Sequence, residues 1–240
     1  MNTQLNDPLN SNDVVRSAGL QDVSFLAQID LEATRAPFQQ SFWEDILEPT
    51  GTSPLQFLES MLQCGASHWG QIQDFLVIER NGQPVAACAV FRPADISAAH
   101  SPLNIDKLPQ IAEKLGWTPS ITEDFRQAYL KIWEGDHSFL KPQADMIVET
   151  VAVLPEHRGL GLGHRLMQAA FKRAREAGAS SLGVMVIRGN EPAQALYEKY
   201  FERFATFYPA FFNHTFSGVT KYRATLNASK ENTSHGKGSH

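Results

Sequence analysis

VETVAVLPEHRGLGLGHR, residues 148–165, combines the signals for a strand, an anion-binding loop and a helix within eighteen residues. The run from Met146 to Val153 is rich in β-branched residues and predicts a buried strand. Pro155 ends this strand, because proline cannot continue a strand ladder. The glycine-rich residues that follow lead directly into an amphipathic helical pattern, which Gly178 ends.

The loop between the strand and the helix suits a phosphate group. Gly159, Gly161 and Gly163 allow the backbone to approach a ligand and to turn its N–H groups inward. The first turn of the following helix has unpaired N–H groups and the positive end of the helix dipole, and both favour negative charge. Arg158 can add a charge-assisted contact. This pattern predicts an anion site just before the helix.

One charged residue, Glu149, interrupts the apolar strand. A carboxylate in a buried run requires an explanation, because desolvation of the charge is costly. Burial would raise the pKa of this carboxyl group toward neutral pH. The other interpretation places Glu149 at a wet edge of the sheet, and the sequence leaves both open.

Length and composition limit the classes of protein. The chain has 240 residues, enough for one large domain with an insertion. A net charge of −5 argues against a nucleic-acid-binding protein. We expect no membrane partner, since no uncharged run could span a bilayer, and no secretory signal at residues 1–13. The oligomeric state stays open.

Cysteine and histidine usage suggests a reducing compartment and no metal site. Cys64 and Cys88 lack metal-ligand spacing, so we expect a cytoplasmic protein with two core thiols rather than a bridge. His157 and His164 have no partner at ligand spacing, and we expect His68 and His100 to be surface or packing residues rather than ligands.

The N-terminal part predicts one short strand followed by several helices. The strand covers residues 14–16, and Asp22 is expected to cap the first helix. Ser41 and Glu44 have the spacing of a capping box, and Ser53 with Pro54 opens a further helix.

A hairpin and a long insertion come next. Runs at 75–78 and 85–91 flank Asn81-Gly82, a strong signal for an antiparallel hairpin. Residues 93–142 are too many for a plain loop, and they contain two helical patterns. One ends at Gly116, and the other begins behind Ser120 and Glu123, which are spaced as a capping box. We expect this helical insertion to dock on the sheet; covering the substrate is the alternative.

The C-terminal part predicts a strand at 182–187, a helix capped by Asn190, and a final strand at 218–226. Seven aromatic residues between 201 and 216 suggest core packing or, alternatively, a pocket wall. The polar segments 1–12 and 227–240 are expected to be disordered.

The chain resembles the GCN5-related N-acetyltransferase (GNAT) superfamily over roughly residues 14–226. The family signature Arg/Gln-x-x-Gly-x-Gly/Ala stands here as Arg158, Gly161 and Gly163. A second family pattern stands as Asn190 followed by Leu196-Tyr197-Glu198-Lys199. The chain departs from the family at Tyr200, where a glycine is usual, so we expect this helix to run on or to end differently.

The resemblance implies the fold and the cofactor site. It implies an α/β (α+β) fold with a mixed, mostly antiparallel central sheet flanked by helices, in a domain of residues 13–226 with the insertion at 93–142. Acetyl-CoA would lie in a V-shaped gap between the strands at 146–153 and 182–187, and no metal is implied. The residues implied to bind it are Val151, Ala152, Val153, Arg158, Gly159, Leu160, Gly161, Leu162, Gly163, His164 and Asn190.

The resemblance also implies the catalytic groups. Tyr197 matches the family's usual proton donor to the departing thiolate; the alternative is a packed core tyrosine. Members that resemble ribosomal-protein acetyltransferases carry a base where Met185 stands, and methionine cannot accept a proton. Glu149 matches the base of members that resemble polyamine acetyltransferases; otherwise water fills that role.

We therefore expect an enzyme that transfers an acetyl group from acetyl-CoA to a primary amine of a small molecule or peptide, in a ternary complex. The alternative is a non-catalytic acyl-CoA-binding module of the same shape, which the loss of a base at Met185 would favour. A different phosphate-binding fold fits poorly, because the glycines are spaced G-x-G-x-G and no Lys-Ser/Thr follows them.

Overall fold

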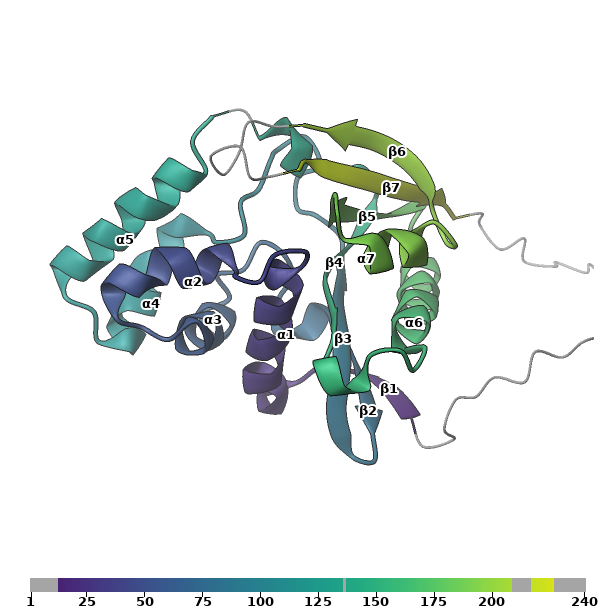
Figure 1. Ribbon diagram of the computed structural model, residues 1–240, viewed down its shortest axis with the longest axis horizontal. Helices are drawn as coiled ribbons and strands as arrows, with labels where there is room; N and C mark the ends of the chain where they lie inside the picture. The colour runs from purple at the N-terminus through teal and green to yellow at the C-terminus, as the bar shows by residue number, and fades with distance from the viewer. Residues whose placement is uncertain (1–12, 136, 209–216, 227–240) are drawn as a thin grey trace, which may run out of the picture.

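The computed structural model describes residues 13–135, 137–208 and 217–226, and a seven-stranded sheet runs through it in the order β1-β2-β3-β4-β5-β7-β6 (Figure 1). All neighbouring strands are antiparallel except β4 and β5, which are parallel. The expected mixed, mostly antiparallel sheet is confirmed. The strands are β1 (Asp13–Ser17), β2 (Phe75–Arg80), β3 (Gln83–Phe91), β4 (Met146–Val153), β5 (Ser181–Ile187), β6 (Glu202–Phe207) and β7 (Val219–Thr225).

Helices cover both faces of the sheet. α1 (Val23–Arg35) packs on one face and α6 (Leu162–Glu176) on the other (Figure 1). The alternation of side chains along a strand separates the two cores. In β3, Ala87 and Ala89 belong to the core under α1, whereas Cys88 and Val90 belong to the core under α6. The remaining helices are α2 (Phe42–Leu47), α3 (Pro54–Gln63), α4 (Leu108–Leu115), α5 (Pro119–Ile132) and α7 (Glu191–Tyr197).

Two predicted local signals are confirmed. Ser41 caps α2: its side chain accepts a hydrogen bond from the backbone N–H of Trp43, and Glu44 accepts one from the N–H of Ser41. Asn81 and Gly82 join β2 to β3 with positive φ angles of 53° and 76°, the values that a tight hairpin turn requires.

We expect Ser41→Ala to lower the free energy of unfolding by about 1–2 kcal/mol, since the cap is fully buried and also contacts the Thr34 hydroxyl at 2.8 Å. Urea denaturation measures this change. Ser120→Ala is the control, because Ser120 is exposed and should matter by less than about 0.5 kcal/mol. Equal effects of the two variants would contradict the capping role.

Two predicted caps are wrong. Asp22 precedes α1, but its carboxylate makes no capping bond. It accepts two hydrogen bonds from Arg16, each of 2.7 Å, and one of 2.8 Å from the backbone N–H of Gly19, so its oxygens are occupied by groups that precede the helix. α5 begins at Pro119 and is capped by Thr118 rather than Ser120, since proline is well suited to the first position of a helix.

The helical insertion packs mainly on other helices. The prediction that it would dock on the sheet is therefore wrong. α4 packs against α3, and α5 packs against α2 and α4. Two aromatic residues of α5, Phe125 and Tyr129, are buried against Trp43 of α2 and Phe57 of α3. The three N-terminal helices therefore form a layer between the insertion and the sheet (Figure 1).

The C-terminal region contains a strand that sequence patterns did not predict, the edge strand β6. The described aromatic residues predicted to form a core cluster lie in and around β6. Phe201 is buried as expected, but Phe204 and Tyr208 are 51% and 70% exposed. An arginine lies over each exposed ring. The guanidinium carbon of Arg223 lies 5.6 Å from the ring centre of Phe204, and that of Arg188 lies 4.7 Å from the ring centre of Tyr208. Three further aromatic residues of the predicted cluster, and both predicted disordered segments, lie outside the described residues.

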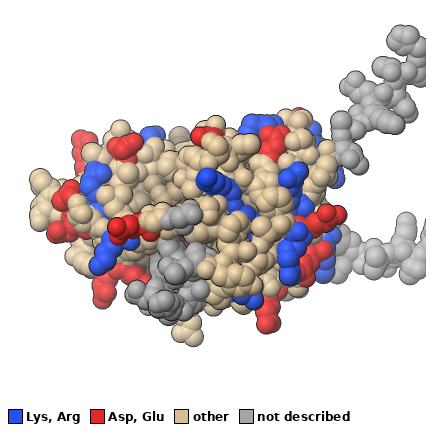
Figure 2. All heavy atoms as spheres, turned by 90° about the horizontal axis from the view of Figure 1, so that it is seen from above, with Lys and Arg blue, Asp and Glu red and all other residues tan. Residues whose placement is uncertain are grey.

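Other features agree with the composition. Cys64 and Cys88 are free thiols, so no bridge joins them. Lys and Arg side chains lie interspersed with Asp and Glu on the face that Figure 2 shows. Within the described ranges, no helix has the length and apolar character that crossing a membrane requires. The domain limits at residues 13 and 226 stay a prediction.

Candidate active site

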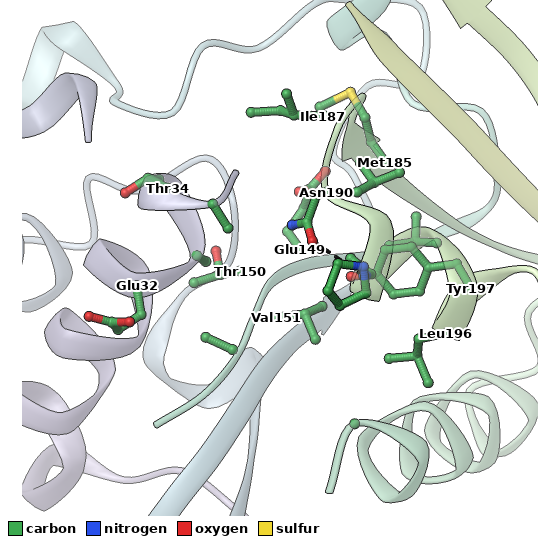
Figure 3. Close-up of a pocket in the computed structure, with 18 of the residues that line it drawn as sticks. Glu32, Thr34, Glu149, Thr150, Val151, Met185, Ile187, Asn190, Leu196 and Tyr197 are labelled. Atoms are coloured by element: carbon green, nitrogen blue, oxygen red, sulfur yellow. Dashed lines mark hydrogen bonds between the residues drawn. The ribbon is translucent and has the colours of Figure 1, made fainter. Parts of the chain in front are cut away.

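A cleft opens where β4 and β5 separate. The two strands pair only from Met146 with Leu182 to Val148 with Val184, and no described strand pairs with β4 on this side beyond that point. The residues that follow on both strands line a cavity of about 950 Å³. The expected V-shaped gap between these strands is therefore present, and α1 and α7 stand on either side of it (Figure 3).

A β-bulge in β4 shapes the cleft. Ala89 of β3 pairs with Glu149, and Ala87 pairs with Ala152, so that Thr150 and Val151 together oppose a single residue of β3. Thr150 has a φ of 52°, which is strained for a β-branched residue. Bulges bend a strand and redirect its side chains. Here the bulge directly follows Glu149 and lies at the point where β4 leaves β5.

The predicted cofactor residues gather around this cavity. All of them line it except Leu160, whose side chain is 47% exposed. Gly159 and Gly161 have φ angles of 77° and 76°, and α6 begins at the next residue, Leu162. A side chain at Gly163 would lie 3.0 Å from Leu196 of α7, so the third glycine allows α6 and α7 to approach each other.

Arg158 is engaged within the protein. Its guanidinium donates to the Glu32 carboxylate at 2.8 Å and to the carbonyl of Val153 at 3.0 Å. Its side chain is nevertheless 56% exposed, so an anion at the loop competes with Glu32 for the same group.

We expect Arg158→Ala to weaken CoA binding by about tenfold, the value of one charge-assisted contact that is partly offset by the pairing with Glu32. Calorimetric titration with CoA measures the dissociation constant. Lys172→Ala is the control, because Lys172 lies on the exposed side of α6, where it pairs with Glu176. An unchanged dissociation constant in Arg158→Ala would remove Arg158 from the cofactor site.

α7 is held at both ends by side chains. Asn190 caps it, accepting a hydrogen bond of 3.3 Å from the N–H of Ala193, and also lines the cleft. The helix ends at Tyr197 without the glycine that is usual in the family. Tyr200 occupies that position, and its hydroxyl lies 3.1 Å from Nδ1 of His164 at the start of α6. The expected different ending is confirmed, and it ties α7 to α6.

The carboxyl group of Glu149 has a raised pKa in the cleft. Its side chain is partly buried and lines the cavity. Desolvation raises the pKa of its carboxyl group from 4.5 to about 8, and the positive charge of Lys221 opposes this rise. The carboxyl group therefore titrates near the pH at which a general base works best.

Tyr197 stands at the C-terminal end of α7 and faces the same cavity (Figure 3). Its ring is 4% exposed and packs against Phe201 and Tyr222. Desolvation, and then the charge of Glu149, raise the pKa of its hydroxyl well above the usual value. The hydroxyl therefore stays protonated at neutral pH and can act as a donor.

Sequence reasoning missed several groups near these two residues. Trp133, Phe139 and Leu140 of the insertion line the cleft together with Met185, so the insertion reaches the site at its C-terminal end. Lys221 of β7 was also missed, because a lysine in an alternating strand reads as a solvent-facing residue, yet its side chain is buried. No sequence signal identifies it without the sheet order.

Metal ligands do not gather in the described part of the chain: no group of three or more His, Cys, Asp or Glu residues there could hold an ion.

Residues 38–202 match the Acetyltransferase (GNAT) family, which is more than half of the sequence. The chain belongs to this family. It is an enzyme family, and the α/β sheet with its splayed β4 and β5 has the corresponding fold.

One curated relative matches this acetyltransferase over a short segment. A Bacillus subtilis (strain 168) protein described as a candidate [ribosomal protein bS18]-alanine N-acetyltransferase is 38% identical over 56 residues, which is 23% of this chain and 37% of that protein. The match thus spans little more than a third of that relative.

Solved structures share the fold. An N-acetyltransferase from Staphylococcus aureus Mu50 superposes with a TM-score of 0.55 and 16% identity, over 88% of this chain and 100% of the other. The protein yncA of Salmonella typhimurium, described as a candidate acetyltransferase and solved with its cofactor acetyl-CoA, superposes with a TM-score of 0.50 and 15% identity, over 90% of this chain and 95% of the other.

The residues of the cleft fit acetyl-CoA. The edge of β4 beyond Val148 offers backbone groups to an extended chain, as an additional strand would. The two left-handed glycines and the first turn of α6 offer N–H groups to a pyrophosphate. These backbone groups match the hydrogen-bonding requirements of a pantetheine arm and of a pyrophosphate, the two parts of acetyl-CoA that the cleft would have to hold.

Proposed function

We propose that this acetyltransferase transfers the acetyl group of acetyl-CoA to a primary amine of a small molecule or peptide, by direct attack in a ternary complex. The observation that carries the proposal is that Glu149 and Tyr197, with opposite proton-transfer abilities, line the same cavity at the separation of β4 and β5. Acetyl-CoA supplies an activated thioester carbonyl when bound.

The two side chains account for the proton balance. Glu149, once ionised, accepts a proton from the attacking amine, either directly or through water. The amine nitrogen forms a bond to the acetyl carbon while the carbon–sulfur bond breaks. Tyr197 donates its hydroxyl proton to the departing sulfur, and solvent returns one proton to Tyr197 and removes one from Glu149. The enzyme forms no covalent bond to the acetyl group in this scheme.

We assign the roles of the cofactor residues in the same proposal. Backbone groups of Val151–Val153 hold the pantetheine arm. The loop from Arg158 to His164, Leu160 by its backbone included, holds the pyrophosphate, and Asn190 adds a further contact. We also infer a cytoplasmic location, which the two free thiols support.

A direct assay separates this proposal from a binding module without activity. Purified protein is incubated with acetyl-CoA and a panel of small amines, amino acids, polyamines and peptides, and the release of free thiol is followed. Thiol release that depends on one class of amine supports the proposal. Tight CoA binding without turnover of any amine would favour the binding module, and failure to bind CoA would contradict both.

A further inference from the structure

A second cavity, of about 540 Å³, adjoins the cofactor cleft. The two cavities share four lining residues, namely Trp69, Leu140, Glu149 and Met185. A molecule in the second cavity can therefore reach Glu149 without occupying the part of the cleft that is formed by the glycine loop.

Lys221 lines this second cavity, and its position is unusual for a lysine. On β7 it lies opposite Met185 of β5, and it is only 3% exposed. Its ammonium group donates a hydrogen bond to the carbonyl of Lys141 and lies 5.6 Å from the ring centre of Phe207. Among the described residues, no carboxylate lies within ion-pair distance of it.

The other charged side chains around the second cavity already have partners. Arg92 forms an ion pair with Asp145. The Asp74 carboxylate accepts a hydrogen bond of 2.7 Å from the backbone N–H of Gln71. Lys221 has a single carbonyl partner for three N–H donors within the described residues, so it can bind an anionic group that enters this cavity.

Lys221 and Glu149 lie close enough to influence each other. Burial lowers the pKa of Lys221 to about 8, and the charge of Glu149 opposes this shift. The second cavity thus presents a buried cation near the partly buried carboxyl group of Glu149. Both groups line the second cavity, so this pair matches a molecule that carries both an anionic group and an amine.

We propose that the acceptor carries a carboxylate next to its primary amine, as an amino acid does, and that Lys221 binds the carboxylate while the amine reaches Glu149. This assignment rests on the proposed acetyl transfer and names the class of its acceptor. Lys221 is a specificity-determining residue in this arrangement, because it replaces the water that a free carboxylate would otherwise keep.

Matched acceptors test the assignment. The specificity constant kcat/KM is measured at pH 7 for alanine against ethylamine and for phenylalanine against 2-phenylethylamine, in the wild type and in Lys221→Met. We expect Lys221→Met to lower the ratio of amino acid to amine by about tenfold or more, the value of one charge-assisted contact. Any effect of Lys221 on Glu149 is common to both acceptors and cancels in this ratio.

Lys141→Met is the control, because it removes an exposed ammonium and keeps the backbone carbonyl that Lys221 contacts. The ratio should not change in this variant. Equal losses for both members of each pair in Lys221→Met would overturn the assignment and leave acetyl transfer itself intact.

A binding measurement is independent of turnover. In the presence of CoA, N-acetylphenylalanine should bind to the wild type at least tenfold more tightly than N-acetyl-2-phenylethylamine, and Lys221→Met should abolish the difference. Equal binding of the two compounds to the wild type would overturn the proposal even if no amine is turned over. Thermal unfolding of Lys221→Met verifies that the variant folds.

Discussion

Glu149→Gln is expected to lower amine-dependent turnover by about 100-fold or more, because an amide cannot accept the proton that the amine loses. The substitution keeps the shape of the side chain, and CoA binding should stay within about twofold of the wild type. Glu113→Gln is the control, since Glu113 is an exposed carboxylate on α4. Steady-state kinetics with saturating acetyl-CoA measure the difference.

The pH profile identifies the proton acceptor. The active form of a base is ionised, so kcat/KM of the wild type should rise with pH and level off above about 8, the pKa to which burial raises Glu149. Glu149→Gln should lose this limb. An unchanged profile in the variant would assign the base to water or to another residue.

Stability gives a second readout with a defined sign. Because the pKa of Glu149 is higher in the folded protein than its ordinary value of 4.5, the folded state binds more protons between pH 4.5 and about 8. The contribution of Glu149 to stability therefore falls as pH rises through this window. The free energy of unfolding of the wild type minus that of Glu149→Gln should therefore be smaller at pH 9 than at pH 5.

Tyr197→Phe is expected to lower turnover by about 100-fold while CoA affinity stays unchanged. The variant keeps the ring that packs against Phe201 and Tyr222 and loses only the hydroxyl that faces the cavity. The departing sulfur would then leave as a thiolate without a proton donor, and general-acid catalysis is typically worth factors of this size.

Tyr222→Phe provides a matched control for the tyrosine. Its ring centre lies 6.2 Å from that of Tyr197, and it too is buried, but its hydroxyl donates to Glu198 at 3.1 Å and it does not line the cleft. Turnover should stay within about threefold of the wild type. Equal losses in the two variants would show that packing, and not proton donation, explains the effect of Tyr197.

The sequence predicted the features that depend on neighbours along the chain. The strand at 146–153, the glycine loop and the helix after it follow from residue type and spacing, and the structure has all three. The caps at Ser41 and Asn190 are also local, since each bonds to a backbone N–H two or three residues away.

Features that depend on distant partners were missed. Asp22 accepts hydrogen bonds from Arg16 and none from the first turn of α1, which follows it. Lys221 is buried on β7, which lies between β5 and β6 in the sheet. The edge strand β6 was also missed, because Phe201 just before it and Phe204 and Phe207 within it recur every third residue, a spacing that does not indicate a strand.

The bulge at Thr150 is the least predictable part of the site. A positive φ at a β-branched residue contradicts its local preference, so the surrounding sheet must impose it. The bulge directly follows Glu149, at the point where the pairing of β4 with β5 ends.

A crystal structure with CoA and an acceptor amine tests the central claim most directly. The account predicts the pyrophosphate at the loop of residues 159–164, the thiol within hydrogen-bond reach of the Tyr197 hydroxyl, and the amine within reach of Glu149, directly or through one water. CoA bound outside the gap between β4 and β5, or a thiol directed away from Tyr197, would contradict it.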